Sequence, residues 1–331
     1  MYSLYNSYQL KLDKWTGKAG LRLEHTAINA DFSSANTLVA PNYNNLIPSI
    51  SLQRSFKTSS INFGYTDRIQ RPGIWQLNPF VDKSNPKFIN TGNPDLRPEL
   101  DHSLELNYSN FAKQSINIGL SCAFSNNSIQ NVSSISHVTN ASKGTDTVTT
   151  TTYQNLGSNK NLGLNFNTNL TYFKKLTISL NGQLNKLWLE GTYNGTLYHN
   201  QGITGNAFLN AGYKFDKGPR VGINAGYFSG SINLQGKSRE YIYSSFSASQ
   251  EVLKKKGTIS ISANNPYSKY YNFTSYTRTP DYIQTAVSRN NYRSFNISFN
   301  YKFGRLNSEI KRNQHGINND DTKSGGKNTG S

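Results

Sequence analysis

The sequence has little cysteine and no long apolar run. Cys122 is the single cysteine among 331 residues, so neither an intrachain disulfide nor a metal site of several cysteines can form. No segment approaches about 18 consecutive apolar residues, which excludes a membrane-spanning helix. A basic-then-apolar leader is missing as well, because Met1 to Trp15 has the pattern of a strand.

The motifs of common catalytic sites are also missing. The five histidines are scattered, and none belongs to an H-x-x-x-H or H-E-x-x-H pair. There is no G-x-S-x-G elbow, phosphate-binding loop or G-x-G-x-x-G. The acidic pair Asp320-Asp321 lacks the spacing of a calcium loop. We therefore expect no enzyme activity, no cofactor and no bound metal.

Aromatic residues, by contrast, are plentiful. They make up 12% of the chain, although only 35% of the residues are hydrophobic. Disordered chains lack aromatics, so this composition predicts folded strands that are polar on one side, as in a transmembrane barrel.

The net charge of +17 is dispersed over turns and the C-terminal tail, with no basic helix. We expect anionic lipid headgroups, or plain solubility of the turns, to explain this excess, and we expect no nucleic-acid partner.

Apolar and polar residues alternate along most of the chain, and this period of two predicts β-strands. Ile116, Ile118 and Leu120 share one face, whereas Asn117 and Gly119 share the other. The same pattern recurs at residues 61–65, 104–108, 162–172, 221–227, 259–263 and 295–303. A soluble sandwich alternates too, so the connections must decide between the two folds.

Two kinds of connection strictly alternate. Short turns are expected at Thr16–Lys18, Lys57–Ser59, Asn110–Gln114, Phe173–Lys175, Asp216–Pro219 and Lys254–Gly257. Longer loops are expected at Asn29–Asn45, Thr66–Asp101, Asn126–Lys160, Glu190–Gly202, Ser229–Arg239 and Asn264–Asn291. Outer-membrane barrels sort their connections in this way, with short periplasmic turns and long extracellular loops. The predicted fold is therefore all-β, an antiparallel up-and-down transmembrane β-barrel.

These connections imply about thirteen strands, of which the first leads into a short turn. A complete bacterial barrel has an even number of strands. We therefore expect the chain to be part of a larger barrel, whose N-terminal strands and export leader lie upstream.

One loop resembles a known family. It contains Arg68 with Arg71-Pro72, then Leu77-Asn78-Pro79-Phe80, Gly92-Asn93-Pro94 with Leu96, and Pro98-Glu99 before a strand. This segment resembles the TonB-dependent receptor superfamily, and most closely its outer-membrane β-barrel family. The resemblance implies a barrel of about 22 strands filled by an N-terminal plug, through which an inner-membrane energy-coupling complex acts. Residues 1–304 would be the C-terminal part of that barrel, and residues 305–331 a polar, disordered periplasmic tail.

The loop also has a physical interpretation. Its five prolines between Arg71 and Glu99 fix φ and cannot donate ladder hydrogen bonds, so we expect a stiff cap over the barrel mouth. Ligand contact is the alternative. Its candidate residues are Arg68, Arg71, Trp75 and Phe80.

The final strand provides another expected contact. Phe299, Tyr301 and Phe303 alternate at its end, which resembles the aromatic signal that the barrel-assembly machinery reads, although a membrane-interface aromatic is equally compatible. Outer-membrane lipid and lipopolysaccharide are the other expected partners.

The leading functional hypothesis is a receptor or transporter barrel in the outer membrane of a Gram-negative bacterium, which binds or takes up a nutrient. The alternatives are a passive porin or structural barrel, and a secreted β-rich binding module or adhesin.

Overall fold

A computed structural model describes residues 1–33, 36–112, 114–140, 144–216, 218–303 and 322–323. Strands dominate, and the one helix of these residues is the short α1 (Ile74–Leu77). No helix in the described part of the chain is long and apolar enough to cross a membrane.

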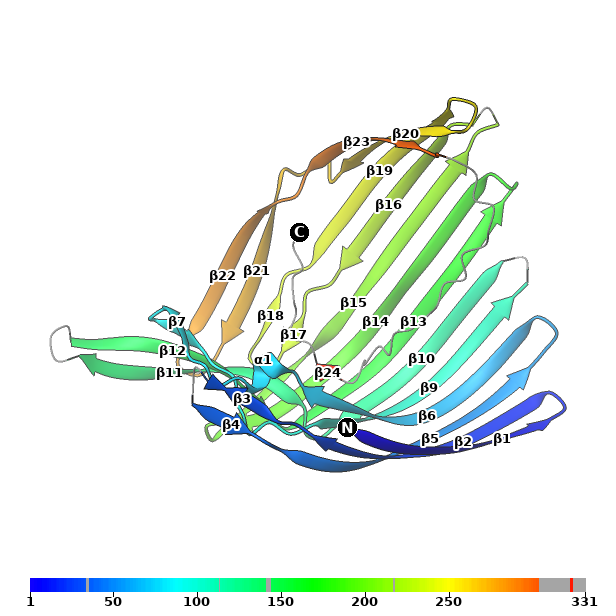
Figure 1. The fold of residues 1–331 in the computed structure, drawn as a ribbon. Helices are drawn as coiled ribbons and strands as arrows, with labels where there is room; N and C mark the ends of the chain where they lie inside the picture. Colours follow the sequence, from blue (N-terminus) through cyan, green and yellow to red (C-terminus); the bar gives the residue numbers. More distant parts are fainter. Residues whose placement is uncertain (34–35, 113, 141–143, 217, 304–321, 324–331) are drawn as a thin grey trace.

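The largest sheet is a curved, open wall in which each strand pairs with the next along its path (Figure 1). All of these pairings are antiparallel. In order, the strands are β1 (Tyr2–Leu12), β2 (Trp15–Ala27), β5 (Asn42–Ser55), β6 (Ser59–Pro72), β9 (Glu99–Phe111), β10 (Ser115–Ser125), β13 (Ser158–Tyr172), β14 (Leu176–Tyr193), β15 (Thr196–Lys214), β16 (Arg220–Phe228), β19 (Tyr241–Val252), β20 (Gly257–Asn264) and β23 (Ser294–Tyr301). This up-and-down order confirms the all-β, antiparallel part of the prediction. Over the described residues β1 and β23 stay at opposite edges and the wall does not close, so a barrel of about 22 strands stays a prediction.

The long connections contain smaller sheets of their own, all at the end of the wall opposite the short turns (Figure 1). One is the hairpin of β3 (Ala30–Phe32) and β4 (Thr37–Val39). A second runs in the order β11 (Ile129–Asn140), β12 (Gly144–Asn155), β8 (Phe88–Asn90), β7 (Asp82–Asn85). A third contains β17 (Ile232–Asn233), β18 (Gly236–Ser238), β21 (Tyr270–Arg278) and β22 (Ile283–Asn291).

Strand register gives the wall two unlike faces. Leu120 on β10 lies opposite Leu106 on β9 and Leu164 on β13, and its own side chain is 51% exposed. On the other face Asn117 on β10 lies opposite Asn167 on β13, which in turn lies opposite Asn181 on β14. We call these the outer and the inner face. The exposed row of leucines suits contact with lipid, and the asparagine row suits a wet lumen.

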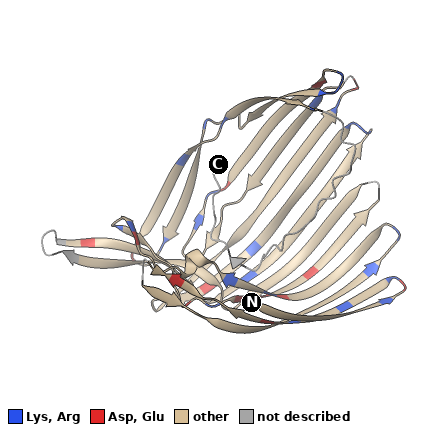
Figure 2. Cartoon of the chain, viewed as in Figure 1, with Lys and Arg blue, Asp and Glu red and all other residues tan. Residues whose placement is uncertain are grey.

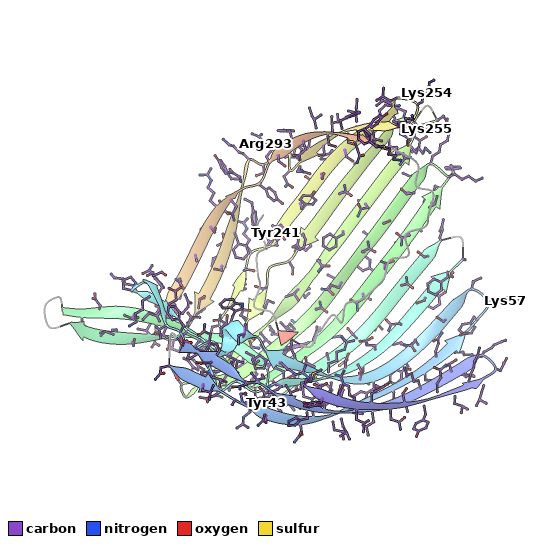
Figure 3. All side chains as sticks on the ribbon, viewed as in Figure 1. Tyr43, Lys57, Tyr241, Lys254, Lys255 and Arg293 are labelled. Carbon is purple, nitrogen blue, oxygen red and sulfur yellow. The ribbon has the colours of Figure 1, made fainter. Side chains whose placement is uncertain are left out.

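Basic side chains gather at the short-turn end of the wall, where Figure 2 shows lysine and arginine near the strand ends. Lys57, Lys254 and Lys255 are labelled there in Figure 3. In one of these turns the carboxylate of Asp216 lies 2.8 Å from Nζ of Lys175, and this hydrogen bond raises the pKa of Lys175.

Three expected boundaries are wrong. The first turn lies at Asp13 and Lys14, ahead of the expected Thr16–Lys18, because Asp13 takes the positive φ of 50° that the turn requires. The expected loop Glu190–Gly202 is instead a tight turn at Asn194 and Gly195, both with positive φ. Asn-Gly is the strongest short hairpin signal, and β14 and β15 continue up to it.

The loop expected at Thr66–Asp101 starts late, because β6 continues to Pro72 through its pairing with β9.

Phe303 lies two residues beyond the end of β23 at Tyr301, with its ring against that of Tyr301. In the tail, Thr322–Lys323 forms β24, which pairs parallel to β6 at Arg71 and Pro72. The predicted disorder of the rest of the tail lies outside the described residues.

Candidate ligand-binding site at the loop end of the wall

The family-like loop folds around a small core of its own. Gly73 donates its backbone N–H to Oε1 of Gln76 at 2.9 Å, which starts α1. The helix and the following turn then bury Leu77 and Leu96, each 1% exposed. They pack in one cluster with Phe32, Val39 and Ile129, from β3, β4 and β11. The burial of these side chains attaches three separate loops to one another.

Glycine and asparagine hold the backbone of this loop. The N–H of Gly92 donates to the carbonyl oxygen of Asn78 at 2.9 Å, and Asn93 donates to that of Gln76 at 2.6 Å. A Cβ at position 92 would lie 2.4 Å from the Asn78 oxygen, so only glycine fits this approach. The side chain of Asn93 adds a hydrogen bond to the carbonyl of Tyr153 on β12.

Polar side chains then join the loop to the β11–β12 hairpin. Asn155 accepts the N–H of Arg97 through Oδ1 at 2.8 Å and donates to its carbonyl through Nδ2 at 2.9 Å. The buried carboxylate of Glu99 accepts the N–H of Ile129. The motif residues between Arg71 and Glu99 therefore form a hydrogen-bonded loop, which we call the cap; its stiffness over a barrel mouth stays a prediction from its prolines.

A second cluster continues this layer across the wall. Val132 on β11 packs with Leu189 and Tyr193 on β14 and with Leu234 between β17 and β18. Next to it the buried Gln235 accepts the N–H of Ser133 at 2.7 Å and donates to its carbonyl at 3.2 Å. Residues about a hundred positions apart in the sequence are thus held together, and the loops form one connected layer.

Hydrogen bonds and burial shift the pKa values of two titratable side chains in this layer. Hydrogen bonds from the Ser84 hydroxyl and then from its N–H lower the pKa of Asp82 at the start of β7. Burial raises the pKa of Tyr282, which lies between β21 and β22. Over the described residues, no group of three or more His, Cys, Asp or Glu side chains could hold a metal ion.

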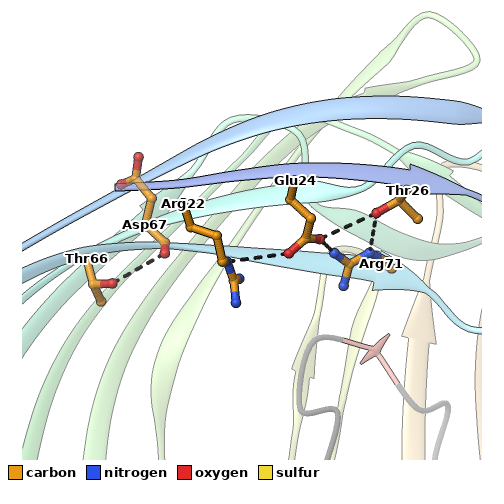
Figure 4. Close-up of polar contacts among 6 residues, drawn as sticks. All are labelled: Arg22, Glu24, Thr26, Thr66, Asp67 and Arg71. Carbon is orange, nitrogen blue, oxygen red and sulfur yellow. Dashed lines mark hydrogen bonds and ion pairs between the residues drawn. The ribbon is translucent and has the colours of Figure 1, made fainter. Parts of the chain in front are cut away.

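Beyond Thr66, β6 no longer pairs with β5, and it places the side chain of Arg71 beside β2. The guanidinium of Arg71 forms an ion pair with Glu24, and its Nε donates to Thr26 at 3.2 Å (Figure 4). Both charged side chains are almost fully buried. A second arginine, Arg22, lies 3.4 Å from the other carboxylate oxygen of Glu24. Because a buried charge is costly unless it is paired, this cluster fixes β6 against β2.

Beside this cluster the inner face has a polar pocket of about 850 Å³. Arg22, Arg68, Gln70 and Asp101 supply most of its hydrogen-bonding capacity. Arg68 is well exposed, and its guanidinium lies 3.8 Å from the carboxylate of Glu105. The volume lies in the range of small-ligand sites, and the two guanidinium groups suit oxygen-rich anionic ligands.

The four candidate contacts are separated in space. Arg68 lines the pocket, whereas Arg71 is buried in its ion pair with Glu24. Trp75 and Phe80 lie on the cap with side chains 66% and 49% exposed, away from the pocket lining. Their role as ligand contacts stays a prediction.

Sequence reasoning missed Arg22, Gln70 and Asp101 as pocket residues. A partial signal exists for Gln70, which lies two residues from Arg68 and therefore on the same face of an extended strand. For Arg22 and Asp101 the approach depends on sheet register, which pairs Asp101 with Arg68.

An antiparallel wall with a lipid-compatible outer face, short turns at one end and a folded loop layer at the other defines an outer-membrane β-barrel protein. The comparison with protein families agrees. The chain belongs to the outer membrane protein beta-barrel family, whose model matches residues 1–301. The resemblance seen in the sequence is thereby confirmed. No curated protein matches the chain.

Solved structures of similar fold are receptors and transporters. The siderophore receptor PirA from Pseudomonas aeruginosa has a TM-score of 0.57 at 14% identity, covering 90% of this chain and 47% of that protein. A ferric enterobactin receptor (PfeA) mutant from the same organism gives 0.58 at 15%, covering 91% and 44%. The FrpB iron transporter from Neisseria meningitidis (F3-3 variant) gives 0.57 at 16%, covering 91% and 45%. The chain spans less than half of each, and at such identity the likeness concerns the fold. None of the three is named as an enzyme, which fits the expected lack of catalysis.

Proposed function

We propose that this chain forms part of the wall of an outer-membrane receptor that binds a nutrient at the cell surface and passes it inward. The observation that carries the proposal is the polar pocket on the inner face, under a cap that closes around its own core. A ligand entering between the loops would meet Arg22 and Arg68 before it reached the asparagine-lined face below.

The pocket favours a ligand with several anionic or carbonyl oxygens. Two guanidinium groups donate in fixed planar geometry, while Gln70 and Asp101 add an amide and an acceptor. Iron chelates have such oxygens, and the names of the similar structures mention siderophores and iron. Acidic sugars and peptides also present such oxygens. The pocket therefore selects a ligand by its oxygen atoms, and a bound iron ion is not required.

Energised uptake would also require a plug and a coupling segment, encoded outside residues 1–331, that engage an inner-membrane complex. Assembly would use the terminal aromatics Phe299, Tyr301 and Phe303. The first two lie on β23, whose outer-face side chains are exposed at the edge of the wall.

The test is the accumulation of ⁵⁵Fe-labelled ferric enterobactin, a chelate rich in phenolate oxygens, by cells that express the whole gene product. Energised uptake predicts accumulation that a protonophore abolishes. Leakage that is insensitive to the protonophore and extends to unrelated small solutes would instead identify a passive porin. Release of the protein without detergent would identify a secreted module.

Two matched variants locate the ligand. Arg68→Ser should lower uptake about tenfold or more, because a charge-assisted hydrogen bond to the ligand is lost. Arg220→Ser is the control. Arg220 is also exposed and lies 3.5 Å from a glutamate, Glu251, but at the short-turn end. Equal uptake in both variants would remove the pocket from the proposal.

A further inference from the structure

The outer face changes chemistry abruptly toward the long loops. Across four neighbouring strands, β9, β10, β13 and β14, one row is entirely leucine: Leu106, Leu120, Leu164 and Leu184. Two rows further on, the residues in register are His102, Phe124, Lys160, Trp188 and Gln201. Aromatic, cationic and amide side chains replace leucine within about four residues of strand, roughly 13 Å. In a membrane barrel such a change marks the level of the lipid headgroups.

A groove of about 900 Å³ lies at this boundary. Its apolar part includes Cys122, Leu162 and Trp188, which point to the outer face. Its polar part includes Lys160 and Gln201, one row nearer the loops than Leu162. The groove is therefore apolar toward the membrane centre and polar toward the cell exterior.

Two lysines flank Trp188. Lys160 lies directly opposite it in register, and Nζ of Lys186 lies 5.6 Å from the centre of its ring. The nearby acid Glu190 is already engaged, 3.2 Å from Nδ1 of His199. Over the described residues, neither lysine has a carboxylate within ion-pair distance. Two cations without a protein counter-charge thus lie near the lipid headgroup level: Lys160 lines the groove in the row of Trp188, and Lys186 lies outside the lining, one row nearer the membrane centre in register with Leu162.

We propose that this groove binds a phosphorylated glycolipid of the outer leaflet, of the lipid A type. Lys160 and Lys186 hold a phosphate of the sugar backbone, Trp188 packs against the sugar, and an acyl chain follows Leu162 toward the leucine row. The charge complementarity of two ammonium groups and a phosphate selects the occupant, and the apolar floor requires acyl chains on the same molecule. The inference rests on the membrane placement in the proposed function, but not on its nutrient.

The test is native mass spectrometry of the whole gene product, purified in detergent, stripped of lipid and titrated with bisphosphorylated lipid A. Removal of both ammonium groups in Lys160→Ser/Lys186→Ser should weaken binding about tenfold or more, since each lysine near an anionic lipid surface adds about 1 kcal/mol. Lys160→Arg/Lys186→Arg, which keeps both charges, should bind like the parent. The control Lys174→Ser/Lys175→Ser removes two lysines from a short turn and should change binding less than twofold.

Two further lipids distinguish the occupants. Dephosphorylated lipid A should bind as weakly to the parent as lipid A does to the double-serine variant. Phosphatidylglycerol that binds as tightly as lipid A would overturn the glycolipid assignment in favour of any anionic lipid. Unchanged lipid A affinity in Lys160→Ser/Lys186→Ser would overturn the site. If that variant fails to run as a folded, heat-modifiable band on a gel, the single changes Lys160→Ser and Lys186→Ser answer the same question. Chelate uptake should be unaffected by all of these changes.

Discussion

The buried ion pair of Arg71 and Glu24 holds two strands of this wall together. Arg71→Met should destabilise the protein by about 3–5 kcal/mol, because it removes the buried cation that pairs with Oε1 of the buried Glu24 carboxylate. Denaturant titration of the folded protein in detergent, followed by tryptophan fluorescence, measures the change. The double variant Glu24→Gln/Arg71→Met removes both charges and should recover much of the loss. If the double variant is as unstable as the single one, the ion pair is not the cause.

The two faces of β13 provide a second comparison at this scale. Phe166 lies on the outer face opposite Ile118, and its neighbour Asn167 donates a hydrogen bond to Asn181 on the inner face. Phe166→Arg should cost about 2–4 kcal/mol, because it places a charge in the lipid layer near mid-depth. Asn167→Arg should be much milder, since the inner face is wet. Refolding into lipid vesicles at graded urea concentrations measures both, and equal effects would mean that the faces are assigned the wrong way round.

At the scale of elements, the cap depends on one close backbone approach. Gly92→Ala would drive a methyl group against the carbonyl oxygens of Asn78 and Gln76, so the loop must open around α1. We expect residues 73–98 to become sensitive to a protease added to intact cells, whereas the strands stay protected. Gly17→Ala is the control, because a Cβ there meets nothing within 4 Å. A cap that resists the protease in Gly92→Ala would show that the loop tolerates the shift.

Strands in the wall could be predicted because each has one apolar and one polar face. The β11–β12 hairpin could not, because it lies in water beyond the wall. Along β12 the run Thr147–Thr152 contains Val148 as its one apolar residue, so its β-propensity is not accompanied by a period in hydropathy. The same argument explains why Glu190–Gly202 was expected to be a loop. There β14 and β15 rise above the lipid, and their outer residues include Glu190 and His199.

The pocket was predictable only in part, for a reason of topology. Arg68 was recognised because it belongs to the family-like segment. Arg22 is 46 positions away in the numbering and joins the pocket because β6 leaves β5 beyond Thr66 and curves toward β2. No local pattern encodes that departure. The two lysines that flank Trp188, Lys160 and Lys186, were equally hidden, since their proximity follows from the register of β13 and β14.

At the scale of the whole molecule, every functional statement depends on which end of the wall faces outward. Because Cys122 is the single cysteine, Cys122→Ser gives a background in which one reporter thiol can be placed at either end. Lys83→Cys puts it on β7 in the loop layer, and Lys57→Cys puts it in a short turn. Both lysines are exposed, so the two thiols differ in the side of the membrane on which they lie and not in their exposure to solvent.

A membrane-impermeant maleimide added to intact cells should label Lys83→Cys and leave Lys57→Cys unlabelled until the outer membrane is permeabilised. This outcome follows if the loop layer is extracellular and the lysine-rich turns are periplasmic, as the connection lengths indicate. The opposite labelling would place the cap in the periplasm and the outer groove in the inner leaflet, where phospholipids replace the glycolipid. It would therefore contradict the receptor and the glycolipid site together, while leaving the antiparallel wall itself unchanged.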